Sequence, residues 1–189
     1  MNKKLKVPCL FLDRDGVINI DYGYVHTKEE TVYKENLSIL LEIAKKKQIM
    51  ILIITNQSGI ARGFFSEEVF VKYMNWLKED LLKKFGNTFD DYFFCPHHEE
   101  AKVTKYKQKC KCRKPKPGLF QIAEKKYNID LKKSIMIGDN FSDMEAAKKA
   151  EVKFRFLLTN KELNCSYITK RINTFNDPTL LKILSNINK

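Results

Sequence analysis

Short apolar segments that alternate with helical segments are the feature that most restricts the fold of this chain. Residues 7–12 form an apolar run that ends abruptly in charge, and residues 49–54 are apolar and β-branched, as in strands buried on both faces of a sheet. Between them, the apolar residues of 36–47 recur at helical spacing. Strands that alternate with helices form parallel sheets through right-handed crossovers. We therefore predict an α/β fold with a Rossmann-like, doubly wound parallel sheet.

The same alternation continues along the rest of the chain. Further strands are expected at 91–95, 135–137 and 154–158, and helices from Ser66 onward and at 117–127, 143–150 and 180–187. No segment has the composition of a linker, so we predict one domain that spans residues 1–189. The short stretch between Asp13 and Thr55 leaves no room for a large cap domain.

Acidic side chains follow the first and fourth predicted strands. Asp13 and Asp15 are two residues apart, so both can point into one crevice, where they repel unless a cation bridges them or one carries a proton. Gly138 and Asp139 follow the fourth strand, and Asp143 lies one helical turn further on. Ligands of doubly wound folds bind at the carboxyl ends of the strands, and Mg²⁺ prefers oxygen ligands. The pattern predicts a magnesium site there.

Phosphate-binding groups follow the second and third predicted strands. Thr55 and Asn56 offer a hydroxyl and an amide to phosphoryl oxygens, and Arg113 and Lys114 precede a predicted helix, where anions bind. A carboxylate that approaches a phosphate ester is repelled by about 4 kcal/mol per pair of charges at ~4 Å and an effective dielectric of about 20. The cations would offset this repulsion, so that Asp13 can attack phosphorus.

The predicted reaction is phosphoryl transfer to a carboxylate. Asp13 would form an aspartyl-phosphate, while Asp15 protonates the leaving alkoxide and then deprotonates the water that releases phosphate. Thr55 and Lys114 would stabilise the transferred phosphoryl group. These four residues are our predicted catalytic set.

A cysteine-rich loop follows the third predicted strand. Cys95, His97, Cys110 and Cys112 supply three thiols and an imidazole, a ligand set typical of closed tetrahedral Zn²⁺ sites. The stretch between these pairs is polar and lysine-rich, and a metal would order it. We predict a structural zinc in a loop at about 95–112, with reduced, unliganded cysteines as the alternative.

Charge and hydropathy restrict the partners. The formal net charge is +12, which attracts nucleic acid, acidic membranes or anionic metabolites. The lysines are scattered, no nucleic-acid motif is visible, and the longest apolar stretch, 49–55, is too short to cross a bilayer. We expect a monomeric cytoplasmic protein with a small-molecule substrate and no nucleic-acid or membrane partner. A nucleic-acid end-processing or binding protein, with the cysteine loop as a zinc finger, is the alternative from another class.

Four motifs resemble those of the haloacid-dehalogenase (HAD) type phosphatases, in the order of that family. They are Leu12-Asp13-Arg14-Asp15-Gly16, Thr55-Asn56, Lys114 and Gly138-Asp139-x-x-x-Asp143. Longer runs resemble the heptose 1,7-bisphosphate phosphatases within that family: Asp21–His26, Thr55–Gly63 and Cys112–Gly118. The resemblance covers about residues 10–150 and implies removal of the 7-phosphate of a sugar bisphosphate that supplies heptose for surface polysaccharide. Histidinol-phosphate phosphatases, the alternative, share the aspartate pair and the cysteine loop but lack the run after Gln57.

The resemblance also implies residue roles. Mg²⁺ would be held by Asp13, the backbone carbonyl of Asp15, and Asp139, and the structural zinc by the three cysteines with His97 rather than His98. The implied substrate-binding residues are Asp21, Tyr22, Gly23, Tyr24, Asn56, Gln57, Ser58, Arg113 and Asn140. The family carries Lys at the position of Asn140, so we expect a changed grip on one phosphate or a changed sugar preference.

Overall fold

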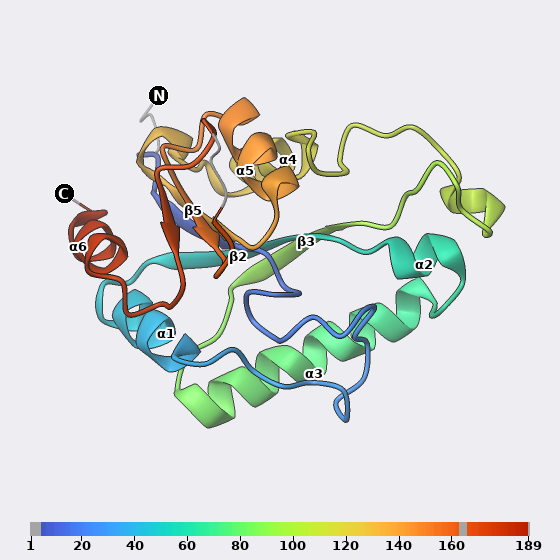
Figure 1. Cartoon of the computed structure of the whole chain (residues 1–189), viewed down its shortest axis with the longest axis horizontal. Coiled ribbons are helices and arrows are strands. Elements are labelled where there is room, and N and C mark those ends of the chain that lie inside the picture. Colours follow the sequence, from blue (N-terminus) through green and yellow to red (C-terminus); the bar gives the residue numbers. More distant parts are fainter. Residues whose placement is uncertain (1–4, 163–165, 189) are drawn as a thin grey trace.

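The computed structural model describes residues 5–162 and 166–188 and contains one six-stranded parallel sheet (Figure 1). The strand order is β3-β2-β1-β4-β5-β6, and every pairing is parallel. The strands are β1 (Cys9–Leu12), β2 (Met50–Asn56), β3 (Asp91–Cys95), β4 (Ile135–Gly138), β5 (Phe154–Leu158) and β6 (Lys170–Ile172). The predicted α/β fold is confirmed.

The register brings the carboxyl ends of the central strands to one level. Leu12 at the end of β1 pairs with Ile53 in β2 and with Ile137 in β4. The next residue, Asp13, donates its backbone N–H to the carbonyl of Ile137 at 3.0 Å. Residues that follow β1, β2 and β4 therefore emerge at the same edge of the sheet.

Helices cover both faces of the sheet. They are α1 (Leu37–Lys46), α2 (Ser58–Arg62), α3 (Glu67–Phe85), α4 (Gly118–Tyr127), α5 (Phe141–Lys149) and α6 (Pro178–Asn186), with short 3₁₀ turns η1 (Thr104–Tyr106) and η2 (Leu131–Lys133). In Figure 1, α1 to α3 lie on one side of the strands and α4 and α5 on the other, and α6 lies next to α1.

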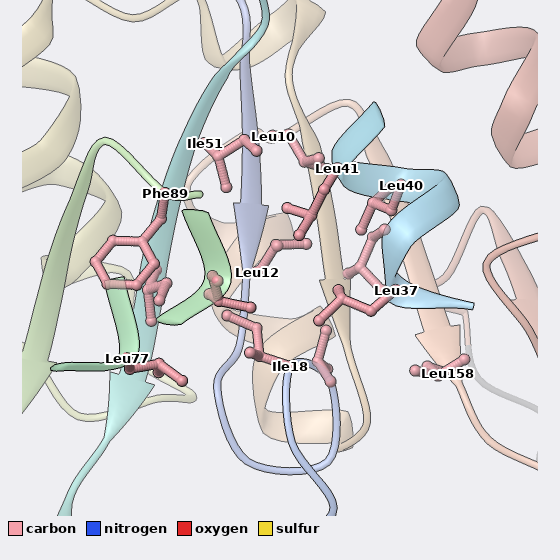
Figure 2. Close-up of a cluster of buried hydrophobic side chains, with 14 of the residues drawn as sticks. Leu10, Leu12, Ile18, Leu37, Leu40, Leu41, Ile51, Leu77, Phe89 and Leu158 are labelled. Carbon is pink, nitrogen blue, oxygen red and sulfur yellow. The ribbon is translucent and has the colours of Figure 1, made fainter. Parts of the chain in front are cut away.

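Each face of the sheet has its own hydrophobic core. Leu10 and Leu12 of β1 point toward the core that includes α1, α3 and α6 (Figure 2). Cys9 and Phe11, their alternate neighbours, point into the core formed with α4 and α5. This alternation with period two explains why β1 is entirely apolar, because both of its faces are buried.

Three elements differ from the sequence prediction. β6 was not predicted, because only Ile172 of its three residues is buried and so short a run has no periodicity. Helix α2, which follows β2, has only five residues and was not predicted. Helix α5 begins at Phe141 rather than Asp143, because Asn140 caps it and Asp143 is the third residue of that capping box.

No cap domain interrupts the described residues between β1 and β2, where the chain forms a loop and α1. Between β3 and α4 the chain forms an irregular stretch that contains η1 and is drawn at the right of Figure 1. Within 5–162 and 166–188, no helix combines the length and apolar character that a membrane crossing requires.

Candidate active site

A cleft of about 420 Å³ lies where β1, β2 and β4 end. Most of the predicted site residues line it, together with Ser142 and Asp143. They are Asp13, Asp15, Asp21, Gly23, Tyr24, Thr55, Asn56, Gln57, Ser58, Arg113, Lys114, Asp139 and Asn140. Tyr22 does not line the cleft and is 64% exposed. The fold thus gathers side chains from four distant parts of the chain around one hollow.

Lys114 lies at the bottom of this cleft, buried between two carboxylates. Its Nζ is 2.9 Å from Asp13 Oδ2 and 2.6 Å from Asp143 Oδ1, and it also donates to the carbonyl of Ile54 at 2.8 Å. Burial alone would lower the pKa of Lys114, but the two carboxylates raise it to about 12. The ammonium group is therefore a fixed positive charge beside Asp13.

Asp139 completes a cluster of three carboxylates. Ligand oxygens of Asp13, Asp139 and Asp143 all lie within 4.8 Å of one another. Burial, followed by the charges of Asp13 and Asp143, raises the pKa of Asp139 to about 7. Three carboxylates beside one ammonium group carry a net charge of −2, which a divalent cation neutralises. The donor set therefore fits a hard divalent metal ion.

The oxygens of Asp143 are already engaged. Oδ1 contacts Lys114, and Oδ2 accepts a 3.0 Å hydrogen bond from the backbone N–H of Asn140. Burial raises the pKa of Asp143 to about 6, although Lys114 opposes this shift. Asp143 belongs to the fourth motif, but it is not one of the predicted site residues. Its contacts make it an ion-pair partner of Lys114.

Gly16 allows Asp139 to approach the aspartate pair. A Cβ at this position would lie 2.0 Å from Asp139 Oδ2, and the glycine has φ +78°, a conformation that other residues rarely adopt. Both features require glycine. The Gly in the Asp-x-Asp-Gly motif is therefore part of the carboxylate cluster and not only of a turn.

Asn56 and Gln57 hold other site groups in place. Asn56 donates to the carbonyl of Lys114 at 3.1 Å and accepts from its N–H at 3.0 Å, so both amide atoms clamp that backbone. Gln57 is almost fully buried, and its Nε2 donates to Thr55 Oγ1 at 3.0 Å and to Asp15 Oδ2 at 3.1 Å. These contacts make both residues supports for the predicted catalytic groups.

The loop of residues 21–26 forms a rim of the cleft. Asp21 accepts from the N–H of Gly23 at 2.8 Å, and Tyr24 has φ 59° with its ring edge-on to Phe64 at 4.6 Å. His26 stacks on Phe65 at 4.5 Å and contacts the carbonyl of Tyr24 at 2.8 Å. The rim is therefore a packed loop that presents Asp21 and Tyr24 to the cleft.

The structure groups Cys95, His97, Cys110 and Cys112, with ligand atoms within 4.8 Å of one another. Cys95 Sγ lies 3.0 Å from Cys112 Sγ and 3.5 Å from Cys110 Sγ, and His97 Nδ1 lies 3.3 Å from Cys112 Sγ. Burial and the Cys112 thiol raise the pKa of Cys95, so this thiol is costly to ionise without a cation. The arrangement fits a tetrahedral metal site.

His98 faces away from this cluster. Its Nε2 lies 3.5 Å from Arg62 Nη2, and its Nδ1 accepts from the N–H of Glu100. Downstream, Tyr106 donates to Glu67 at 2.8 Å, which docks the loop on α3. Arg113 follows the last cysteine and donates to the carbonyl of His97 at 3.4 Å. The Cys/His cluster and the cleft are thus joined through Arg113 and Lys114.

Arg14 is a site residue that the sequence analysis did not predict. Its side chain is fully buried, and its Nη2 donates to Asp15 Oδ2 at 2.6 Å. The sequence signal was a charged residue between two predicted catalytic aspartates. Side chains alternate along an extended segment, so the residue between two aspartates that face one crevice is expected to point away from it.

Comparisons with known proteins agree with this geometry. The family model described as HAD-hydrolase-like matches residues 111–173. The D-glycero-β-D-manno-heptose-1,7-bisphosphate 7-phosphatase of Vibrio cholerae is 43% identical over 80% of this chain and 81% of its own length. The one of Helicobacter pylori is 45% identical over 82% and 85%. A Photorhabdus laumondii relative named for the α anomer is 41% identical over 81% and 83%.

Solved structures give the same result. A Mesorhizobium loti protein classed as a HAD-like phosphatase superposes with a TM-score of 0.88 at 30% identity, over 97% of this chain and 88% of its own. The D,D-heptose 1,7-bisphosphate phosphatase of B. bronchiseptica, complexed with magnesium and phosphate, gives 0.71 at 28% identity over 80% of each chain. This chain therefore belongs to the heptose-1,7-bisphosphate 7-phosphatase family of the haloacid-dehalogenase-like hydrolases.

Proposed function

We propose that this protein is a Mg²⁺-dependent phosphatase that hydrolyses the 7-phosphate of D-glycero-D-manno-heptose 1,7-bisphosphate. The observation that carries the proposal is the contact of Lys114 with Asp13 in a cleft that also contains Thr55 and Asp139. This combination of a nucleophile, a cation, a hydroxyl and a carboxylate cluster suits phosphoryl transfer. The names and solved complexes of the relatives support the heptose bisphosphate as substrate.

Asp13 is the proposed nucleophile. As its oxygen bonds to phosphorus, the bond from phosphorus to the sugar oxygen breaks, and Asp15 gives that oxygen a proton. Water then attacks the aspartyl-phosphate, Asp15 takes the proton, and phosphate leaves. Lys114 stabilises the charge on the phosphoryl oxygens, and Asp143 keeps Lys114 in position.

Magnesium is the proposed metal in the carboxylate cluster. Asp13 and Asp139 would hold it with the backbone carbonyl of Asp15, and it supplies positive charge to the phosphoryl oxygens when bound. A structural Zn²⁺ is proposed for Cys95, His97, Cys110 and Cys112, whose atoms have a matching arrangement. All four positions of a tetrahedral ion would be filled by protein, which leaves none for catalysis.

Arg113 is the residue that we propose to bind the second phosphate of the substrate. This residue and Lys114 line the cleft and also a neighbouring cavity of about 450 Å³ that contains Lys109 and Lys116. Asp21 and Tyr24 line the cleft at its rim, which supports contacts between these residues and the sugar. We propose that the two cavities take the two ends of one bisphosphate.

The experiment is a panel of phosphate esters with Mg²⁺, in which phosphate release is measured at equal substrate concentrations. The panel contains both anomers of heptose 1,7-bisphosphate, the heptose 1-phosphate and 7-phosphate, and histidinol phosphate. Highest kcat/KM for one heptose bisphosphate anomer supports the proposal. Preference for histidinol phosphate, or equal rates across the panel, contradicts it.

A further inference from the structure

Arg14 is a fully buried cation that joins three parts of the site. Its Nη1 donates to the carbonyl of Val25 at 2.6 Å, and its Nη2 donates to Asp15 Oδ2 at 2.6 Å and to Gln57 Oε1 at 3.0 Å. Val25 belongs to the rim loop, and Gln57 follows β2. One guanidinium group therefore links the rim loop, the end of β2 and the proposed proton donor.

Aromatic rings of α3 fix the guanidinium group itself. Its Cζ lies 5.1 Å from the ring centroid of Tyr73 and 5.7 Å from that of Phe70. Among the described residues, Nε of Arg14 is buried without a hydrogen-bond partner. An apolar side chain here would leave the Val25 carbonyl, Gln57 Oε1 and the Asp15 carboxylate without this donor, so the reason for an arginine lies in these three partners.

The contacts of Asp15 indicate what the arginine does. Arg14 and Gln57 both donate to Oδ2 of Asp15. The only donor to Oδ1 within the described part of the chain is Asn19 Nδ2, at 3.0 Å. Two donors occupy Oδ2, so Oδ1 is the oxygen that can carry a proton and give it to a leaving group.

We propose that Arg14 is a positioning residue, which holds Asp15 so that the second lone pair of Oδ1, beside the contact with Asn19, can carry the proton, and which ties Asp15 to the rim loop through Val25. The inference rests on the proposed function, because it assigns the proton transfers of that reaction to one oxygen. When the bond from phosphorus to the sugar oxygen breaks, the Oδ1 proton passes to that oxygen. When water later attacks, its proton returns to Oδ1. Arg14 acts through Asp15 and does not touch the substrate.

The test compares two esters that differ in their need for a proton. Heptose 1,7-bisphosphate releases a basic alkoxide, whereas p-nitrophenyl phosphate releases a phenolate that needs no acid. The quantity measured is kcat/KM, which reports only the steps through departure of the leaving group. For Arg14→Met we expect a loss of at least about 30-fold with the heptose ester and less than about threefold with the aryl ester, because general acid catalysis contributes about 10²- to 10⁴-fold. Equal losses with both esters would overturn the proposal.

A double-mutant cycle tests whether Arg14 acts through Asp15. In an Asp15→Asn background, Arg14→Met should lower kcat/KM for the heptose ester by less than about threefold, because the group it positions is already gone. Multiplied losses in the double variant would show a separate role and would contradict the proposal. Arg14→Lys keeps the charge but not the planar fork of donors, so its loss should lie between wild type and Arg14→Met.

A remote variant controls for lost stability. Ser134 is buried, accepts from the N–H of Cys9 at 3.0 Å and donates to the carbonyl of Asp130 at 2.7 Å. It lies at the amino ends of β1 and β4, so Ser134→Ala should lower the melting temperature and leave the ratio of the two kcat/KM values unchanged. A changed ratio in this variant would mean that the ratio reports stability, and the proposal would lose its support.

If Arg14→Met does not fold, Tyr73→Leu replaces it. This variant removes the ring next to the guanidinium group and keeps Arg14, so a smaller loss confined to the heptose ester is expected. An unchanged ratio of the two kcat/KM values would contradict the proposal.

If the wild type does not hydrolyse heptose bisphosphate, the proposed function fails. Another alkyl phosphate that the wild type does hydrolyse then replaces heptose bisphosphate in the test of Arg14.

Discussion

The side chains of Lys114 and Asp143 approach to 2.6 Å between Nζ and Oδ1, although one follows the cysteine loop and the other lies in α5. The same Nζ is 2.9 Å from Asp13. Asp143 therefore supplies the second of two carboxylates that hold this ammonium group beside the proposed nucleophile. Its capping contact with Asn140 fixes Asp143 in turn, so that the start of α5 determines where the cation lies.

Replacement of Asp143 should therefore reduce turnover more than substrate binding. Asp143→Asn keeps the size of the side chain but removes the charge that holds Lys114. We expect kcat to fall by about 10- to 100-fold with little change in KM, less than the roughly 10²- to 10³-fold cost of removing a donor to the transition state outright, because Asp143 acts through Lys114. Glu145→Gln, which breaks the exposed pair with Lys149 on the same helix, is the matched control and should keep full activity. Equal kcat for Asp143→Asn and wild type would contradict this role.

The nucleophile is tested by Asp13→Asn. The amide cannot form the aspartyl-phosphate, so kcat should fall by at least about 10³-fold, as is usual when a nucleophile is removed. Circular dichroism and the melting temperature should show a folded protein, since the change is isosteric. Turnover within tenfold of wild type by a folded variant would exclude Asp13 as the attacking group.

Gly16→Ala should weaken the metal site specifically. The added Cβ would lie 2.0 Å from Asp139 Oδ2, so the carboxylate must move. We expect a higher Mg²⁺ concentration at half-maximal activity, together with a loss of about 1–2 kcal/mol in stability from the left-handed backbone conformation. Gly23→Ala introduces the same backbone strain at φ +85° but meets no atom within 4 Å. An equal shift in Mg²⁺ dependence for both variants would show that strain, and not Asp139, is the cause.

Much of the site could be predicted because strand ends are visible in a sequence. Asp13, Thr55 and Asp139 each follow a buried apolar run, and parallel strands bring such ends together. The sequence did not predict that Asn56 clamps the backbone of Lys114, because that contact joins β2 to the end of an irregular loop.

Arg14 and β6 were not predicted for related physical reasons. Strand periodicity places Arg14 on the face opposite Asp15, but the long side chain bends until its guanidinium group reaches Asp15 Oδ2. β6 has three residues, of which one is buried, and its pairing with β5 is a contact between segments that local patterns do not encode. Both depend on tertiary contacts rather than on spacing along the chain.

The N-terminal cap of α6 predicts how stability depends on pH. Asp177 accepts from the N–H groups of Thr179 and Leu180 and pairs with Lys170 at 2.7 Å. Burial opposes ionisation, but Lys170 and the two N–H groups lower the pKa of Asp177 below its usual value. Its stabilisation is therefore complete above the unfolded pKa of about 4 and is lost as the pH falls through the lower folded value.

Asp177→Ala should lower the free energy of unfolding by about 1 kcal/mol at neutral pH. The variant should leave kcat unchanged, because Asp177 does not line the cleft. Urea unfolding at pH 7 and near pH 3 measures the effect. The difference between wild type and variant should shrink at the lower pH. A constant difference would mean that the charge of Asp177 does not contribute.

Loss of the proposed zinc should reduce activity through Arg113 and Lys114, which directly follow the last ligand. Cys112→Ser removes a ligand of the cluster, whereas Cys9→Ala removes a fully buried thiol from β1, outside the cluster. Elemental analysis should find about one zinc per chain in wild type and Cys9→Ala and much less in Cys112→Ser. Because the loop then no longer holds Lys114 beside Asp13, kcat of Cys112→Ser should fall at saturating Mg²⁺. Full activity in a zinc-free Cys112→Ser protein would show that the metal does not position Lys114 and contributes only to stability.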